Sequence, residues 1–163
     1  PPAQFDDYAQ RLSNAGVAVT VLPATDLFLM GREHEHSVPR GVSPVHRMLE
    51  QGVTCSLSTN NILNPFTPFG DGSLIRMANL YANIAQVGRP DTMAACLEMI
   101  STRSAELMNL EDYGVTVGKT ADLVVVDNTD PAMAIAEISQ PLMVFKAGRQ
   151  TVDRPLPKLC APR

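Results

Sequence analysis

The sequence contains no tryptophan, only 5% aromatic residues and only three cysteines in 163 residues. The core must therefore be built from aliphatic side chains, alanine and the eight methionines. The cysteines, Cys55, Cys96 and Cys160, are odd in number and match no metal-binding spacing, which disfavours a disulfide scaffold. We therefore expect a reducing, cytoplasmic setting.

A surplus of positive charge and long apolar runs are also lacking. The chain has 13 Lys and Arg against 17 Asp and Glu, and its basic residues are scattered. This pattern argues against nucleic acid or an anionic membrane as a partner. No run approaches the roughly 18 apolar residues of a membrane span, and the start lacks a signal-peptide pattern. Because the chain begins with Pro1 and Pro2 rather than Met, we expect that something upstream is missing.

Two continuous apolar runs, residues 17–22 and residues 53–57, predict strands that are buried on both faces. Helical spacing of apolar residues predicts a helix over residues 4–14 before the first strand. Ser43 and Pro44 supply an N-cap and a first-turn proline for a helix before the second strand. This alternation is typical of βαβ units around a parallel sheet.

Polar residues and turn formers predict loops after both strands. Residues 24–41 lose periodicity and predict one long loop. Residues 58–70 are too rich in Asn and Pro to be regular structure. Ligands of parallel α/β proteins bind at the carboxyl ends of the strands, so the second loop is the first place to look for chemistry.

The rest of the chain predicts three helices and then a change to strands. The helices are expected at residues 74–84 with Asp71 or Ser73 as the N-cap, at residues 92–100 with Asp91 as the N-cap, and at residues 102–108 after Ser101. From Gly114 onward we expect a turn, a strand around residues 123–127 and a hairpin within residues 142–152. The final segment, with Pro155, Pro157 and Pro162, predicts an extended tail.

Several of these segments together resemble the amidohydrolase superfamily. Residues 114–127, residues 144–152 and the helix at residues 102–110 are similar to its C-terminal signature. Within the superfamily, the cytosine deaminase branch is the most similar, through residues 30–32, 40–42, 48–53 and 64–70. The resemblance extends from about Ala9 to Val152, and the order and spacing of the motifs make it specific.

The resemblance implies an α/β fold, namely a C-terminal fragment of a (β/α)8 TIM-type barrel plus part of a small β-sandwich domain. Residues 1–113 would form the last strands and helices of the barrel, residues 114–154 the C-terminal part of the sandwich, and residues 155–163 the tail. A complete barrel needs roughly 250 residues. The N-terminal portion of the same protein is therefore the expected partner, and a homo-oligomer is also expected.

The same resemblance implies hydrolysis of a C–N bond, such as deamination of a cyclic amidine or a related small nitrogen heterocycle. Family members do this with a metal-activated water, so a divalent metal, zinc or iron, is the expected cofactor. We expect the chain to be competent only with its N-terminal portion. That portion would hold the other metal ligands, which this chain lacks.

Asn60 stands where the resemblance places the metal-binding aspartate at the end of the eighth strand. A neutral amide is a poor general base and adds no charge to hold a cation, although its oxygen could contact a metal at most. Two hypotheses therefore stay open, an altered hydrolase and a non-catalytic or metal-free member that acts as a binding or scaffold protein. A stand-alone α/β domain held together by self-association is a third.

Asn61, Phe66 and Asp26 are the candidate substrate-binding residues. Asn61 follows Asn60, Phe66 falls where the relatives place an aromatic near the substrate, and Asp26 lies after the first strand. The alternatives are loop capping for Asn61, an apolar loop anchor for Phe66 and surface charge for Asp26.

His34, Glu35 and His36 form a His-x-His pattern that can bind a transition metal. The ligating pattern of the family follows the first barrel strand, however, so a solvated loop on the active-site face is the favoured interpretation. Arg32 is interpreted as surface charge. Structural roles are expected for three further residues, His46, Cys55 and Cys96.

Overall fold

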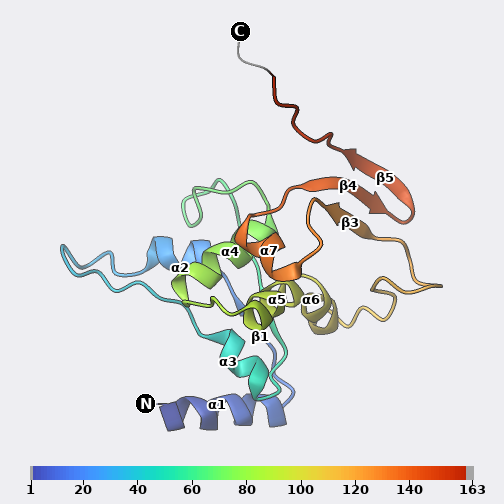
Figure 1. Ribbon diagram of the computed structural model, residues 1–163. Coiled ribbons are helices and arrows are strands. Elements are labelled where there is room, and N and C mark those ends of the chain that lie inside the picture. Colours follow the sequence, from blue (N-terminus) through green and yellow to red (C-terminus); the bar gives the residue numbers. More distant parts are fainter. Residues whose placement is uncertain (1, 161–163) are drawn as a thin grey trace.

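The computed structural model describes residues 2–160, which fold into seven helices and five strands (Figure 1). The helices are α1 (Pro2–Asn14), α2 (Pro23–Leu29), α3 (Val45–Glu50), α4 (Leu74–Ile84), α5 (Pro90–Met99), α6 (Thr102–Leu107) and α7 (Pro131–Ala136). The strands are β1 (Val19–Val21), β2 (Cys55–Leu57), β3 (Leu123–Val126), β4 (Pro141–Lys146) and β5 (Arg149–Asp153). None of the described helices is long and apolar enough to cross a membrane.

The two apolar runs pair as parallel strands, as the sequence predicts. Val19 lies opposite Cys55 and Val21 opposite Leu57, so both strands end at the same edge. Helices α3, α4, α5 and α6 pack on β2. The core therefore lies between β2 and these helices, and it includes Tyr81, Met99 and Ile135.

The prediction that both strands are buried on both faces holds for β2 but is wrong for β1. All three residues of β2 are buried, whereas Thr20 at the middle of β1 is exposed. The physical reason is coverage, because the helices that contact β2 do not pack on β1. Only the alternate residue Val21 is fully enclosed.

Residues 24–41 do not form one long loop, because helix α2 occupies the first part of the segment. Pro23 stands in its first turn, where the fixed φ of proline favours a helix and the missing N–H costs nothing. The same proline also ends the preceding strand. The loop was predicted from this strand-ending property alone, without the ability of proline to begin a helix. The remaining residues, 30–44, are irregular.

Two predicted helix caps are corrected. The N-cap of α3 is Pro44 rather than Ser43, and it makes no side-chain capping bond. The N-cap of α5 is Arg89 rather than Asp91, because Pro90 can occupy the first helical position. Asp91 lies instead in the first turn and pairs with Arg89 at 2.7 Å.

The three helices expected after the loop at residues 58–70 are present as α4, α5 and α6. Ser73 caps α4 by accepting the Arg76 N–H at 3.3 Å. Asp71 has a different task, because it accepts the Ser73 N–H and pairs with the Arg76 guanidinium at 2.9 Å. These interactions fix where the loop ends.

The C-terminal strands form a separate antiparallel sheet in the order β3, β4, β5 (Figure 1). The predicted hairpin joins β4 and β5 through Ala147 and Gly148, which both have positive φ. A two-residue loop with this geometry is the type I′ turn that suits the twist of paired strands. Residues 154–160 have no regular structure, as expected for a tail; residues 161–163 lie outside the described part.

Helix α7 was not predicted, yet it links the C-terminal segment to the core. Asp130 caps it by accepting the Ala132 N–H at 2.8 Å, and Pro131 follows at the first helical position. Ala134 and Ile135 are buried against α4 and α5. The signal was present in the Asp130-Pro131 pair, which is a common helix start.

Tyr81 and His46 form the main polar contact within the core. The Tyr81 hydroxyl accepts the His46 backbone N–H at 3.1 Å and lies 2.7 Å from His46 Nδ1. Because a neutral imidazole nitrogen can accept, the geometry fits a hydroxyl that donates to Nδ1. Burial lowers the pKa of His46 and raises the pKa of Tyr81, so both groups are held neutral.

We expect Tyr81→Phe to lower the free energy of unfolding by about 1–3 kcal/mol, because it leaves the His46 groups without their partner. Denaturant unfolding of the purified protein measures this. Tyr8→Phe is the control, since Tyr8 is half exposed and its loss should change stability by less than about 0.5 kcal/mol. Equal effects of the two substitutions would contradict the role assigned to Tyr81.

Candidate active site

The candidate site lies at the edge where β1 and β2 both end. Val21 and Leu57 are register partners at this edge, so helix α2 and the loop at residues 58–70 leave the sheet side by side. In a parallel sheet this carboxyl edge is where ligands bind. Asp26 on α2 and the three other predicted site residues on the loop all belong to these two segments.

Asn60 is exposed and has a positive φ of 61°. Left-handed backbone is uncommon for residues other than glycine, although Asn and Asp adopt it more readily than most. Such conformations often occur at functional sites, where the surroundings impose them. Asn61 is also exposed, and its carbonyl accepts the Thr59 hydroxyl at 3.3 Å.

Within the loop at residues 58–70, Asn64 forms a tight turn with the residues that follow it, here called the Asn64 turn. The Asn64 side-chain oxygen accepts the Phe66 N–H at 3.0 Å and the Thr67 N–H at 2.9 Å. The Asn64 N–H donates in return to the Thr67 carbonyl at 3.2 Å. Thr67 is only 1% exposed, so this turn is tied firmly to the body of the protein.

Two threonine hydroxyls join the segments that leave β1 and β2. Thr25 on α2 is 7% exposed, and its hydroxyl contacts the hydroxyl of Thr67. The Thr25 hydroxyl also donates to the Thr59 carbonyl at 3.4 Å. Neither threonine was predicted from the sequence, although Asn64 stands two residues before Phe66, the spacing at which Asn side chains bond to their own backbone in turns.

Phe66 is 58% exposed, so Thr67 rather than Phe66 anchors the loop. This leaves the Phe66 ring available as a wall of the site. Phe69 packs edge-to-face on Phe28 of α2, with ring centroids 6.1 Å apart. The guanidinium of Arg32 lies 4.6 Å from the centroid of the Phe28 ring and its Nε donates to the Phe28 carbonyl at 3.3 Å.

Asp26 is partly buried in the first turn of α2, next to Thr25. Its backbone closes the helix, because its carbonyl accepts the Met30 N–H at 3.0 Å. The position on the rim is compatible with the predicted contact to substrate, which stays a prediction.

The His34, Glu35 and His36 segment lies on an exposed stretch, and His34 Nε2 contacts Glu33 at 3.4 Å. Across residues 2–160 no three His, Cys, Asp or Glu side chains gather in a way that could hold a metal ion. The His34, Glu35 and His36 segment is therefore not part of a metal-holding cluster in the described part of the chain.

The residues expected to be structural are buried or partly buried. Cys55 and Cys96 are fully enclosed, and burial raises the pKa of each thiol to about 11, which keeps both protonated. His46 bonds to Tyr81 within the core. None of the three lies on the loop that carries Asn60.

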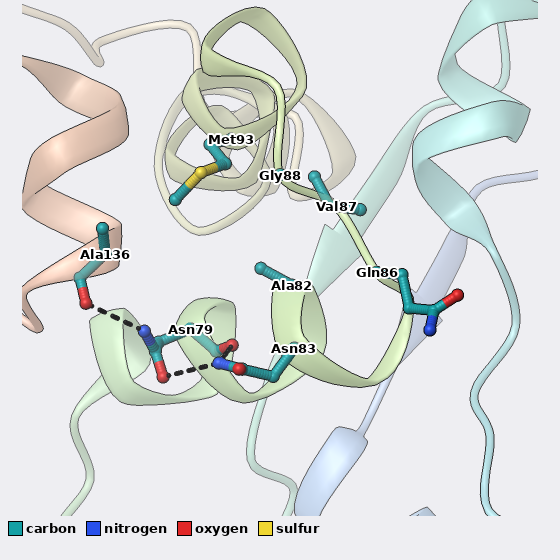
Figure 2. Close-up of a pocket in the computed structure, with 8 residues that line it drawn as sticks. All are labelled: Asn79, Ala82, Asn83, Gln86, Val87, Gly88, Met93 and Ala136. Atoms are coloured by element: carbon teal, nitrogen blue, oxygen red, sulfur yellow. Dashed lines mark hydrogen bonds between the residues drawn. The ribbon is translucent and has the colours of Figure 1, made fainter.

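Two hollows lie away from this edge. The first, of about 410 Å³, is bounded by α4, α5 and α7 (Figure 2). There Asn79 donates to the Ala136 carbonyl at 3.3 Å, and Asn83 donates to Asn79 (Figure 2). The second, of about 370 Å³, lies near Gly16 and Gly52, which precede the two strands. Amide and apolar side chains line the first hollow, and Ser13, Thr54 and Glu106 are among the residues that line the second.

Comparison with known proteins identifies the family. A profile of the Amidohydrolase family matches residues 2–152, so the chain belongs to this family. It is 32% identical over 107 residues to N-isopropylammelide isopropyl amidohydrolase of Pseudomonas sp. (strain ADP), covering 65% of this chain and 27% of that protein. It is 33% identical over 151 residues to 5-methylthioadenosine/S-adenosylhomocysteine deaminase of Desulforudis audaxviator (strain MP104C), covering 87% of this chain and 31% of that protein.

Solved structures show the same fold. The 5-methylcytosine deaminase of Klebsiella pneumoniae, liganded with 5-fluorocytosine, superposes with a TM-score of 0.90 at 23% identity. That match covers 99% of this chain and 40% of the other. N-isopropylammelide isopropylaminohydrolase of Burkholderia multivorans gives a TM-score of 0.73 at 27% identity, covering 89% of this chain and 34% of the other. The parallel strands and their helices are thus part of a (β/α)8 barrel, and the chain spans about a third of its curated relatives.

The Asn64 turn gives a direct test of how the loop is held. We expect Asn64→Ala to speed amide hydrogen exchange at Phe66 and Thr67 by about tenfold, since both N–H groups lose their acceptor. Asn64→Asp keeps the accepting oxygen and should preserve protection. Unchanged exchange in Asn64→Ala would show that the turn does not depend on this side chain.

Proposed function

We propose that this chain is the C-terminal part of a deaminase-type amidohydrolase that hydrolyses a C–N bond of a small nitrogen heterocycle. The observation that carries the proposal is the position of Asn60 at the carboxyl edge of β2, where the resemblance places the catalytic aspartate. Family membership supports the reaction class. The relatives described above, each named as a deaminase or a hydrolase of amino groups, support the substrate class and do not favour a scaffold protein.

Within this proposal the residues of the chain shape the substrate side of the site. The neutral amide of Asn60 can donate and accept a hydrogen bond, so it can orient a ring nitrogen or carbonyl but cannot serve as a general base. The exposed ring of Phe66 offers a flat surface for a planar heterocycle. Asn61 and Asp26 are the proposed polar contacts at the rim.

Members of the family generally use a divalent metal. The side chains described here do not complete a site for one, because residues 2–160 hold no suitable cluster. We therefore place the remaining ligands in the N-terminal portion of the same protein, with zinc or iron as the metal, and assign no catalytic step of this chain to it.

The exposed apolar surface supports an N-terminal partner segment. In the C-terminal sheet, Val124 is 61% exposed and Val125 and Val152 are 38% and 39% exposed. Large uncovered apolar surface commonly marks a site of association. A homo-oligomer, a cytoplasmic location and the absence of nucleic-acid or membrane partners remain parts of the proposal.

Asn60→Asp in the complete polypeptide that carries this chain tests the proposal. The carboxylate adds one negative charge beside the proposed metal, so affinity for zinc should rise by about tenfold or more. Metal analysis and ammonia or amine release from cytosine, N-isopropylammelide and 5-methylthioadenosine are the measurements. The wild type is expected to release product from at least one compound of this class.

Asn61→Asp is the matched control, because it adds the same charge one residue further along and should leave zinc affinity nearly unchanged. The proposal is overturned if the wild type holds no metal and turns over none of these compounds, and if Asn60→Asp restores neither property. Stoichiometric zinc binding and turnover by residues 1–163 alone would refute the need for an N-terminal portion.

A further inference from the structure

The backbone on both sides of Asn60 is held by side chains of threonine. The Thr59 carbonyl, which belongs to the peptide entering Asn60, accepts the Thr25 hydroxyl at 3.4 Å. The Asn61 carbonyl, two peptides further on, accepts the Thr59 hydroxyl at 3.3 Å. These two bonds restrain the backbone around Asn60, which has the left-handed conformation.

The Thr25 hydroxyl has two contacts, because it lies within hydrogen-bond distance of both the Thr67 hydroxyl and the Thr59 carbonyl. A hydroxyl has one proton. In the arrangement in which Thr25 gives that proton to the Thr59 carbonyl, Thr67 is the donor between the two hydroxyls; the contact itself allows either oxygen to donate. The contacts from Thr67 through Thr25 to the peptide that enters Asn60 form a relay, which crosses between the segments that follow β1 and β2.

We propose that Thr25 and Thr67 are positioning residues that set the direction of the Asn60 side chain toward the substrate. This inference rests on the proposed function, because it assigns Asn60 a contact with the substrate. The Thr67 backbone N–H donates to the Asn64 side chain, and Thr25 lies within helix α2. Each threonine is therefore held by the structure around it.

We expect the relay to affect the position of the Asn60 backbone more than the stability of the fold. Two buried hydroxyls that bond to each other can be replaced together by apolar groups of the same shape at little cost in stability. Replacing only one leaves the other without its partner and is more costly. A double Thr25→Val/Thr67→Val variant should therefore stay folded while the peptide before Asn60 loses its donor.

The strands supply a matched control. The hydroxyls of Thr20 and Ser56 lie 2.7 Å apart, within the paired strands and away from the loop. Thr20→Val removes a hydroxyl of the same kind by the same substitution without touching Asn60. Thr25→Ser and Thr67→Ser are the conservative variants, because they keep the donating and accepting oxygen.

The experiment compares these variants in the complete polypeptide by two measurements. Amide hydrogen exchange over residues 60–67 reports loop order without requiring turnover. The kinetic constants kcat and KM, measured for the substrate that the wild type accepts, report whether Asn60 is placed correctly for its contact with the substrate. In the double Val variant we expect faster exchange over residues 60–67 and a kcat lowered by about 10- to 100-fold, because small misplacements are costly in catalysis.

The remaining expectations separate positioning from a general loss of structure. KM should change less than kcat, the melting temperature should match that of Thr20→Val, and the Ser variants should keep wild-type exchange and kcat. The inference is overturned if exchange is unchanged in the double variant, if Thr20→Val lowers kcat as much, or if the Ser variants fail as the Val variants do.

A failure of the proposed function gives a different result from a failure of the relay. If the wild type turns over no heterocycle, that proposal falls, and the exchange rates alone decide whether the threonine relay orders the Asn60 backbone. Unchanged exchange in that case rejects the relay as well.

Discussion

The parallel pairing of β1 and β2 is the constraint on which the candidate site depends. Its register places Val21 opposite Leu57, so the segments that follow the strands start side by side although they are more than thirty residues apart in sequence. A shift by one residue would move each side chain of β2 to the opposite face of the sheet. The contact between α2 and the Asn60 loop, and with it the relay of hydroxyls, exists only in this register.

The pairing of β1 and β2 is stabilised mainly by the helices that pack on β2. Helices α3 to α6 enclose β2, and Tyr81 adds a polar contact to this core by bonding to His46. β1 has no comparable cover, and Thr20 is exposed in its centre. The better-packed strand is thus β2, which leads into the loop that carries Asn60. This packing gives the loop a firm starting point.

The sequence predicted those features that depend on local patterns. Continuous apolar residues in β2 predicted a buried strand, and the Asn and Pro residues after it predicted a loop at the ligand-binding edge. Helix α2 was missed because Pro23 can end a strand and begin a helix at the same time. Helix α7 was missed because the Asp130-Pro131 start was not recognised, since its six residues equal the length of α3 and α6, which were predicted. The Thr25 and Thr67 contact could not be predicted, since its partners are 42 residues apart and neither carries a motif that points to the other.

In the proposed function Asn60 stands in the place of the family's aspartate, and this replacement changes charge without requiring a new backbone. Asn and Asp are the two residues with side chains that most readily adopt the left-handed conformation seen here, because their short polar groups bond locally. The loop that positions an aspartate can therefore position an asparagine in the same place. On the proposed correspondence, the departure from the family pattern concerns the chemistry of one carboxylate, while the threonines, the Asn64 turn and the strand register would serve either residue.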